Sequence, residues 1–253
     1  MSTKEADRLA VLIDADNISS KHAEVIFAEI ASLGEASIRR IYGDFSHGPP
    51  QGWDKETLAR WAIVPHQQFA NTTGKNASDI ALVIDAMDIL HSGRFDAFVL
   101  ISSDSDFTRL ASRIREQGLG VFGIGLQKTP EAFVAACKRF IYIENLEAEV
   151  SADEEQDGKS TKKKKQDLHK AYQLIRNVVL NTSDPEGWAG MGYVGSELGR
   201  RYPDFDSRSY GYKKLSDLVR ATERFEESGN NGNFKIRYRD DLQLKPISRR
   251  SAP

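Results

Sequence analysis

Short apolar runs alternate with amphipathic stretches from residue 8 to residue 146, and this alternation constrains the fold more than any other feature. The apolar runs predict strands at 8–14, 36–45, 63–70, 96–102 and 120–125, with a further apolar segment at 139–146. The amphipathic stretches predict helices at 21–34, 54–62, 78–90, 106–118 and 129–137. Strands and helices that alternate at this spacing predict an α/β fold with a doubly wound parallel sheet.

The second half of the chain has a different pattern. Residues 148–166 hold almost no apolar side chains and pass from an acidic block to a lysine block, which predicts a charged linker. Three helices are predicted beyond it, at 167–181, 193–202 and 209–221, followed by a hairpin whose strands flank the turn Gly229-Asn230-Asn231-Gly232. We therefore expect a first domain at 1–147, a small winged-helix domain at 167–241 and a tail at 242–253.

The two halves also differ in charge. Residues 1–157 carry 15 basic and 25 acidic side chains, whereas residues 158–253 carry 20 and 12. Such an asymmetry indicates two modules with different electrostatic roles.

Acidic side chains follow two of the predicted strands. The strand at 8–14 ends in the letters IDADN, with Asp14, Asp16 and Asn17, and the strand at 96–102 leads into Asp104 and Asp106. In an open parallel sheet, ligands bind beyond the carboxyl ends of the strands where the strand order reverses. If these two strands are neighbours, their carboxylates converge there.

A third acidic group lies on the helix predicted at 78–90. Asp79 falls in its first turn, and Lys75 comes just before it. The helix dipole alone would favour an anion at Asp79 by about 0.3–1 kcal/mol. It does not account for acidic groups at the ends of several consecutive sheet elements.

Convergent carboxylates with no histidine or cysteine cluster nearby form a hard-oxygen site. Such a site suits Mg²⁺ or Mn²⁺ and does not suit Zn²⁺. These ions activate water and neutralise the charge of a phosphodiester. We take Asp14, Asp79, Asp104 and Asp106 as the candidate metal ligands, and Asn17 as a further candidate catalytic residue.

Purely structural roles are open for several of these residues. Asp106 could cap the helix that it precedes, and Asp16 or Ser19 could cap the helix predicted at 21–34. Asp85 and Asp88 are interpreted as ordinary surface or packing acids within their helix.

Three segments, LAVLIDADN, KNASDIALVIDAMD and FVLISSDSDFTRLASRIREQG, resemble the motif blocks of the NYN domain, a LabA-like (DUF88) branch of the PIN-like nuclease superfamily. The resemblance covers about residues 7–146. It implies a PIN-like, Rossmann-like three-layer fold, a Mg²⁺ or Mn²⁺ site and ribonuclease activity. By position, the residues that match the family's acidic and asparagine positions are Asp14, Asn17, Asp79, Asp104 and Asp106. Ser103 departs from the pattern, since the family usually has glycine there.

Two other classes of protein, a metal-dependent phosphatase and a dinucleotide-binding module, fit the same sequence motifs poorly. A haloacid dehalogenase-type phosphatase would need Thr or Val where Asn17-Ile18 stands, and paired acids at a later strand end. A dinucleotide-binding module would need a glycine-rich turn after the first strand, and none is present.

Basic and aromatic residues gather in the second half, in a pattern typical of phosphate contacts with base stacking. The candidate RNA-binding residues are Lys75, Arg200, Arg201, Arg208, Tyr210, Tyr212, Lys213, Lys214, Lys235 and Arg237, with Arg239 beside them on the hairpin. A solvated charged face, or basic protection of an edge strand, is the alternative. Lys162 to Lys165 belong to the linker and would also attract polyanions.

Residues 167–239 resemble the LOTUS (OST-HTH) domain, most specifically in the segment SYGYKKLSDL. This resemblance implies RNA binding, with a preference for G-rich RNA, and in some family members the binding of protein partners.

The sequence thus leads to a metal-dependent ribonuclease, with endonucleolytic cleavage favoured, whose second domain recruits RNA. An RNA-binding adaptor without catalysis is the alternative, and cleavage of DNA stays open. The single cysteine, Cys137, suits a reducing compartment, and neither a secretory signal nor a run of roughly 18 apolar residues is present. We expect a cytoplasmic protein with no membrane contact.

Overall fold

A computed structural model of the chain describes residues 7–69, 77–154, 167–229 and 234–239. The chain divides into two compact units, residues 1–150 and 151–253. Each unit has its own hydrophobic core.

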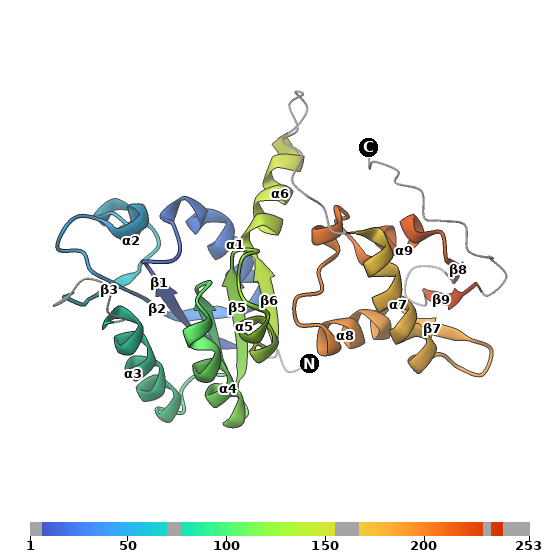
Figure 1. Cartoon of the computed structure of the whole chain (residues 1–253), viewed down its shortest axis with the longest axis horizontal. Helices are drawn as coiled ribbons and strands as arrows, with labels where there is room; N and C mark the ends of the chain where they lie inside the picture. Colours follow the sequence, from blue (N-terminus) through green and yellow to red (C-terminus); the bar gives the residue numbers. More distant parts are fainter. Residues whose placement is uncertain (1–6, 70–76, 155–166, 230–233, 240–253) are drawn as a thin grey trace, which may run out of the picture. The chain divides into compact units, whose positions relative to one another are not determined.

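The first unit is built on a six-stranded sheet in which every neighbouring pair is parallel. The strand order is β3-β2-β1-β4-β5-β6, as Figure 1 shows. The strands are β1 (Arg8–Asp14), β2 (Glu35–Gly43), β3 (Val64–Gln67), β4 (Ala97–Ile101), β5 (Gly120–Gly125) and β6 (Arg139–Tyr142). The predicted doubly wound parallel sheet is confirmed.

Helices cover both faces of this sheet (Figure 1). One face packs against α1 (Ala23–Leu33), the loop before α2 (Lys55–Arg60), and the start of α6 (Ile143–Glu154). The other face packs against α3 (Ala77–His91), α4 (Thr108–Glu116) and α5 (Glu131–Ala136). The first unit is therefore a three-layer α/β structure.

Strand β1 shows why its sequence is a continuous apolar run. Its side chains alternate between the two cores: Leu9, Val11 and Ile13 belong to the α1 side, and Ala10 and Leu12 to the α3 side. All five are fully buried. A parallel strand with both faces covered has no polar face to present, so the alternation of polar and apolar residues is lost.

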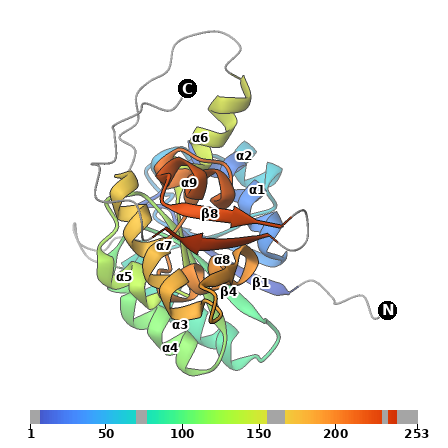
Figure 2. The same ribbon diagram turned by 90° about the vertical axis from the view of Figure 1, so that its right-hand side faces the viewer.

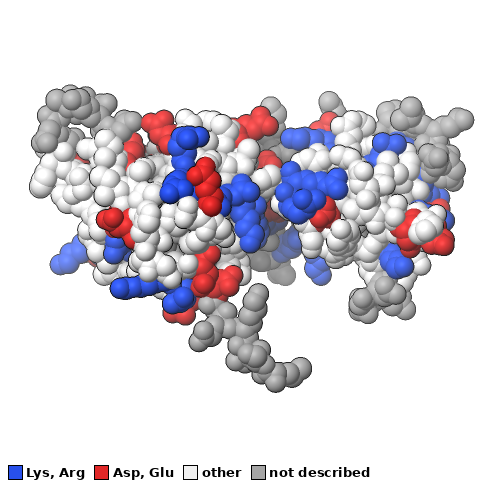
Figure 3. Space-filling model, turned by 90° about the horizontal axis from the view of Figure 1, so that it is seen from below, with Lys and Arg blue, Asp and Glu red and all other residues white. Residues whose placement is uncertain are grey.

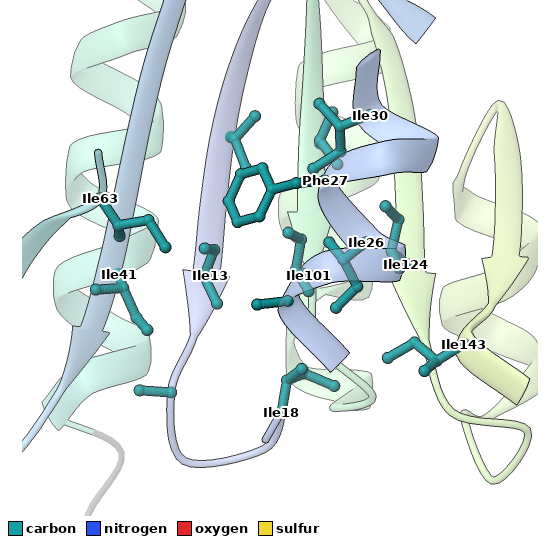
Figure 4. Close-up of a cluster of buried hydrophobic side chains, with 14 of the residues drawn as sticks. Ile13, Ile18, Ile26, Phe27, Ile30, Ile41, Ile63, Ile101, Ile124 and Ile143 are labelled. Atoms are coloured by element: carbon teal, nitrogen blue, oxygen red, sulfur yellow. The ribbon is translucent and has the colours of Figure 1, made fainter. Parts of the chain in front are cut away.

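The core on the α1 side also fixes the loop that follows β1. Ile18 lies in this loop, and its side chain is fully buried beside Ile26 of α1 and the end of β4, as Figure 4 shows. The backbone after Asp14 is thereby anchored to the core.

The order of the sheet reverses between β1 and β4. The chain moves outward from β1 through β2 to β3, and then returns to place β4 on the other side of β1. The expected adjacency of these two strands is confirmed, with Leu9 to Ile13 in register with Ala97 to Ile101.

The predicted linker begins later than the sequence suggested. Strand β6 ends at Tyr142, and α6 starts at the next residue and continues to Glu154. The helix thus extends past residue 148, where the linker is predicted to begin, because the Ala and Glu residues of this segment favour helix. Residues 155–166, including the lysine block, lie outside the described residues.

The second unit combines helices with a three-stranded antiparallel sheet in the order β7-β9-β8. Figure 2 shows its hairpin strand β8 and the helices α7, α8 and α9. The elements are α7 (Leu168–Thr182), β7 (Trp188–Gly190), α8 (Met191–Arg201), α9 (Leu215–Thr222), β8 (Phe225–Ser228) and β9 (Lys235–Tyr238). This is the predicted winged-helix arrangement.

Two details of the second unit differ from the expectation. Strand β7 was not predicted, because three residues that contain a glycine carry no strand pattern. The helix predicted at 209–221 begins only at Leu215. A short 3₁₀ turn ends at Tyr210, and Gly211 then takes a left-handed conformation, with φ of 89°, that interrupts any helix.

No helix within the described ranges is long and apolar enough to span a membrane.

Candidate functional site

Asp14 ends β1 and is buried, with 1% of its surface exposed. Its Oδ2 accepts a hydrogen bond of 2.7 Å from the Ser102 hydroxyl, which follows β4. Its Oδ1 accepts from the backbone N–H groups of Asp16 (3.1 Å) and Asn17 (3.2 Å). Burial raises the pKa of Asp14, and the hydrogen bonds from Ser102 and from the Asn17 side chain oppose this increase.

Asp104 is held at the corresponding end of β4. Its backbone N–H donates to the Ser102 hydroxyl (3.0 Å), so one serine connects Asp14 to Asp104. The Asp104 carboxylate accepts from the Asp106 backbone N–H (2.8 Å) and caps the short 3₁₀ helix Ser105–Phe107.

The capping role considered for Asp106 therefore belongs to Asp104. Asp106 lies within the first turn of that 3₁₀ helix, and its side chain is exposed. The residue at the N-cap of α4 is Phe107, which makes no side-chain capping bond. Asp16 and Ser19 likewise provide no capping hydrogen bond to the start of the first helix.

Ser103 occupies the position where the NYN motif usually has glycine. It is nearly buried, and its hydroxyl accepts a hydrogen bond of 2.8 Å from the Leu126 backbone N–H. The extra side chain is thus used to join the end of β4 to the end of β5.

Asp79 brings a third element to the site from the first turn of α3. Partial burial raises its pKa to about 6, and the negative charges of Asp14, Asp104, Asp16 and Asp106 contribute in that order. The other four carboxylates are therefore close enough to Asp79, beyond the carboxyl ends of β1 and β4, for their charges to raise its pKa.

Asp16 is the acid in this cluster that the sequence did not select as a ligand. Its Oδ2 accepts a hydrogen bond of 2.7 Å from the hydroxyl of Ser78, which precedes Asp79 on α3. This contact joins the β1 loop directly to α3. The sequence places Asp14 and Asp16 together at the end of β1. The contact of Asp16 with Ser78, next to Asp79, arises only because α3 packs beside this loop.

The oxygen donors of this cluster match the chemistry of a hard divalent cation. In the described part of the chain, no three or more Asp, Glu, His or Cys side chains lie close enough together to hold an ion in the arrangement seen. Asp14 is held by its hydrogen bonds, whereas Asp79 is partly exposed and Asp106 is exposed.

Asp85 has a structural role on the same helix. Its carboxylate pairs with Arg40 and accepts a hydrogen bond from the Tyr42 hydroxyl, both on β2. Burial and the adjacent carboxylate raise the pKa of Tyr42. The packing interpretation of Asp85 agrees with these contacts, and Asp88 is exposed.

The basic residues predicted to bind RNA are mostly engaged in ion pairs within the second unit. Arg200 and Arg201 both pair with Glu197, whose pKa falls to about 2 chiefly because of the hydrogen bond from Arg200. Figure 3 shows basic side chains beside acidic ones on the visible face of each unit. The other pairs are Arg208 with Asp206, Lys235 with Asp184, and Arg237 and Arg239 with Glu226.

The two predicted stacking tyrosines differ in exposure. Tyr210 is only 5% exposed and packs against Phe205, so its ring belongs to the core. Tyr212 is half-buried, and Lys213 and Lys214 beside it are exposed. Lys75 lies outside the described residues. The exposed basic surface of this segment is therefore at 213–214.

A parallel sheet in the order 3-2-1-4-5-6, covered on both faces and carrying clustered carboxylates beyond its two central strands, defines a PIN-like α/β fold. The chain belongs to the NYN domain family, whose model matches residues 8–144. The model of the OST-HTH/LOTUS domain matches residues 160–236. NYN is a family of PIN-like nucleases, and LOTUS is an RNA-binding domain.

Similar solved structures add no functional information. A protein of unknown function from Vibrio parahaemolyticus is 21% identical, covers 56% of this chain and 96% of its own, and has a TM-score of 0.45. An uncharacterized protein from Nitrosomonas europaea is 32% identical, covers 36% of this chain and 92% of its own, and has a TM-score of 0.29. No curated protein matches this chain.

Proposed function

We propose that this protein is a divalent-metal-dependent ribonuclease whose N-terminal unit hydrolyses RNA phosphodiesters and whose C-terminal unit recruits the RNA. The observation that carries the proposal is the convergence of five aspartates from β1, β4 and α3 beyond one edge of the sheet. Membership of the NYN family, which consists of PIN-like nucleases, supports hydrolysis, and the match to an RNA-binding domain supports RNA as the substrate.

Asp14, Asp79, Asp104 and Asp106 are the residues that would hold Mg²⁺ or Mn²⁺. When bound, a divalent cation neutralises charge on a phosphodiester and makes a neighbouring water more acidic. Asp14 is held in place by three hydrogen bonds, and Ser102 sets its position relative to Asp104. Asp79 is partly exposed and Asp106 is exposed, so both are accessible to solvent and would be accessible to a substrate.

The C-terminal unit would contact RNA through the exposed lysines Lys213 and Lys214. Phosphate contacts of this kind give affinity without sequence information. A preference for G-rich RNA, endonucleolytic cleavage, protein partners of the second domain and a cytoplasmic location are part of the same proposal.

Cleavage of labelled single-stranded RNA by the purified full chain tests the proposal. We expect cleavage with Mn²⁺ or Mg²⁺, none with EDTA, and slower cleavage of DNA of the same sequence. Asp14→Asn should reduce the rate at least 100-fold and leave RNA affinity within about twofold. Asp88→Asn, an exposed acid on α3, is the matched control and should cleave normally. Equal cleavage by Asp14→Asn and the unsubstituted protein would overturn the assignment.

A second candidate is an RNA-binding adaptor without catalysis. The match to the RNA-binding LOTUS domain supports this candidate, because RNA binding by that domain does not require catalysis in the first unit. Tight RNA binding with no metal binding, measured by calorimetry with Mn²⁺, would select this candidate.

A further inference from the structure

A pocket of about 530 Å³ lies between β3, the start of α2 and the loop that follows β2. Its apolar walls are formed by Phe45, Pro49, Trp53, Leu58 and Pro65. Its volume falls within the range of sites that bind small organic groups. Phe45 follows β2, and β2 pairs directly with β1, which carries Asp14. Part of the pocket wall therefore lies at the carboxyl end of β2, next to the strand whose carboxyl end carries Asp14.

The wall of the pocket and the loop that bears Asp16 are hydrogen-bonded to one another. The Trp53 indole N–H donates to the Ile18 carbonyl (2.7 Å), and the Gln51 amide donates to the Asp16 carbonyl (3.3 Å). The Ser20 hydroxyl donates to the Gly52 carbonyl (2.7 Å). These contacts fix the distance between the pocket and the carboxylates.

Gly52 makes this close approach possible. Its φ of +83° is in the left-handed region, and a Cβ built there would lie 2.8 Å from the Ser20 hydroxyl oxygen. Another residue would be strained in this backbone conformation and would displace the Ser20 hydroxyl from its contact with the Gly52 carbonyl.

The polar groups at the pocket suit a stacked base better than base-specific hydrogen bonding. The Gln67 amide accepts from the Phe45 N–H and donates to Asp44, so it is already used. The Asp54 carboxylate caps α2 through the Thr57 N–H. Lys55 is exposed at the pocket and offers a positive charge for a phosphate.

We propose that this pocket receives one base of the RNA strand, adjacent to the phosphodiester that is cut, and that Lys55 contacts the neighbouring phosphate. Strand β3, which lines the pocket, is two strands from β1, and adjacent strands lie about 4.8 Å apart. The two strands are therefore about 10 Å apart, a span of one to two nucleotides. Bases of single-stranded RNA stack on aromatic side chains, and such contacts tolerate any base. This inference rests on the proposed function for its substrate but concerns recognition, not catalysis.

Photo-cross-linking in EDTA tests the proposal without requiring cleavage. The probe is single-stranded RNA with 4-thiouridine at one position, bound to the full chain, and the cross-linked peptide is identified by mass spectrometry. We expect cross-links within residues 45–67. Cross-links confined to other parts of the chain would overturn the proposal, because they would show that no RNA base occupies the pocket.

Substituted chains provide the second measurement. Phe45→Ala and the milder Phe45→Leu should reduce the cross-link yield, by about tenfold for the alanine variant, because a base–aromatic stack is lost. Lys55→Ala should reduce it by several-fold. Lys138→Ala is the matched control, since Lys138 directly precedes β6 at the opposite edge of the sheet. Equal yields from Lys55→Ala, Phe45→Leu and the control would contradict the proposal even if Phe45→Ala failed to fold.

If the protein cross-links as expected but never cleaves RNA, the ribonuclease proposal fails and the base pocket stands. If it cleaves RNA and the cross-links lie elsewhere, the pocket proposal alone fails.

Discussion

Asp14 and Ser102, which follow neighbouring strands β1 and β4, are joined by a hydrogen bond of 2.7 Å from the serine hydroxyl to the buried carboxylate. The same hydroxyl oxygen accepts the Asp104 backbone N–H. Ser102 therefore opposes the increase in the pKa of Asp14 that burial causes, and it links Asp14 to Asp104.

Ser102→Ala should slow RNA cleavage about tenfold and move the acidic limb of the pH–rate profile to higher pH. The reason is that the serine hydrogen bond lowers the pKa of Asp14, so its loss lets burial raise that pKa further. The profile is measured from initial cleavage rates between pH 5 and pH 9.

Ser103→Ala is the matched control for this effect, because the Ser103 hydroxyl accepts from the Leu126 N–H and not from the groups that hold Asp14. It should leave the acidic limb unchanged. The same displacement in both variants would argue that the effect comes from general loosening of the β4 end.

Asp79→Asn should stabilise the metal-free N-terminal unit at pH 7. The pKa of Asp79 is raised to about 6, so the native state keeps this proton longer than the unfolded state, and the free energy of unfolding falls as pH rises from about 4 to about 6. After allowance for solvent screening of a partly exposed carboxyl, the gain is about 1 kcal/mol, or about 2–4 °C in Tm.

Thermal melts in EDTA at pH 3.5 and pH 7 measure this difference. The two proteins should have similar Tm values at pH 3.5 and differ at pH 7. A lower Tm for Asp79→Asn at pH 7 would mean that helix-dipole stabilisation by Asp79 outweighs repulsion from its neighbours.

Asp85→Asn should destabilise the N-terminal unit by about 1–3 kcal/mol. The substitution removes the negative charge that pairs with the partly buried Arg40, and it leaves one acceptor oxygen where Arg40 and the Tyr42 hydroxyl now use two. Urea unfolding followed by circular dichroism measures the change in midpoint. Asp88→Asn, three residues further along the same helix and exposed, should change the midpoint little. Equal effects of the two substitutions would contradict the structural role of Asp85.

Lys214→Ala and Arg208→Ala should separate RNA contact from folding in the C-terminal unit. Lys214 is exposed, so its loss should weaken RNA binding about equally for all sequences and lower the salt slope by about 1. Arg208 is 12% exposed and paired with Asp206, so its loss should lower Tm. Fluorescence anisotropy and thermal melts measure the two effects. If Arg208→Ala kept the same Tm but lost RNA affinity, Arg208 would be an RNA contact and its assigned role in folding would be wrong.

The sheet could be predicted from the sequence because its central strands are buried on both faces. Leu9 to Ile13 form an unbroken apolar run for that reason, and an acid at position 14 then marks the strand end. The helix start at Lys55 was also predictable, since Asp54 accepts the Thr57 N–H as an N-cap does.

The details of the site depended on contacts that are distant in sequence. Asp16 joins the cluster through Ser78, 62 residues away, and no local pattern reports that contact. The assignment of the cap to Asp104 instead of Asp106 required the 3₁₀ turn to be known. By contrast, the ion pairs of Arg200 and Arg201 could be predicted from the sequence, because Glu197 lies three and four residues before them on one helix.

The central claim is that the aspartates beyond β1 and β4 serve a divalent cation in RNA hydrolysis. Its most direct test is the initial rate of single-stranded RNA cleavage by the full chain as a function of Mn²⁺ concentration, compared with Asp14→Asn. The account predicts a saturable increase with Mn²⁺ for the unsubstituted protein and a rate at least 100-fold lower for Asp14→Asn at every concentration. A rate that is independent of Mn²⁺, or an identical curve for Asp14→Asn, would contradict it.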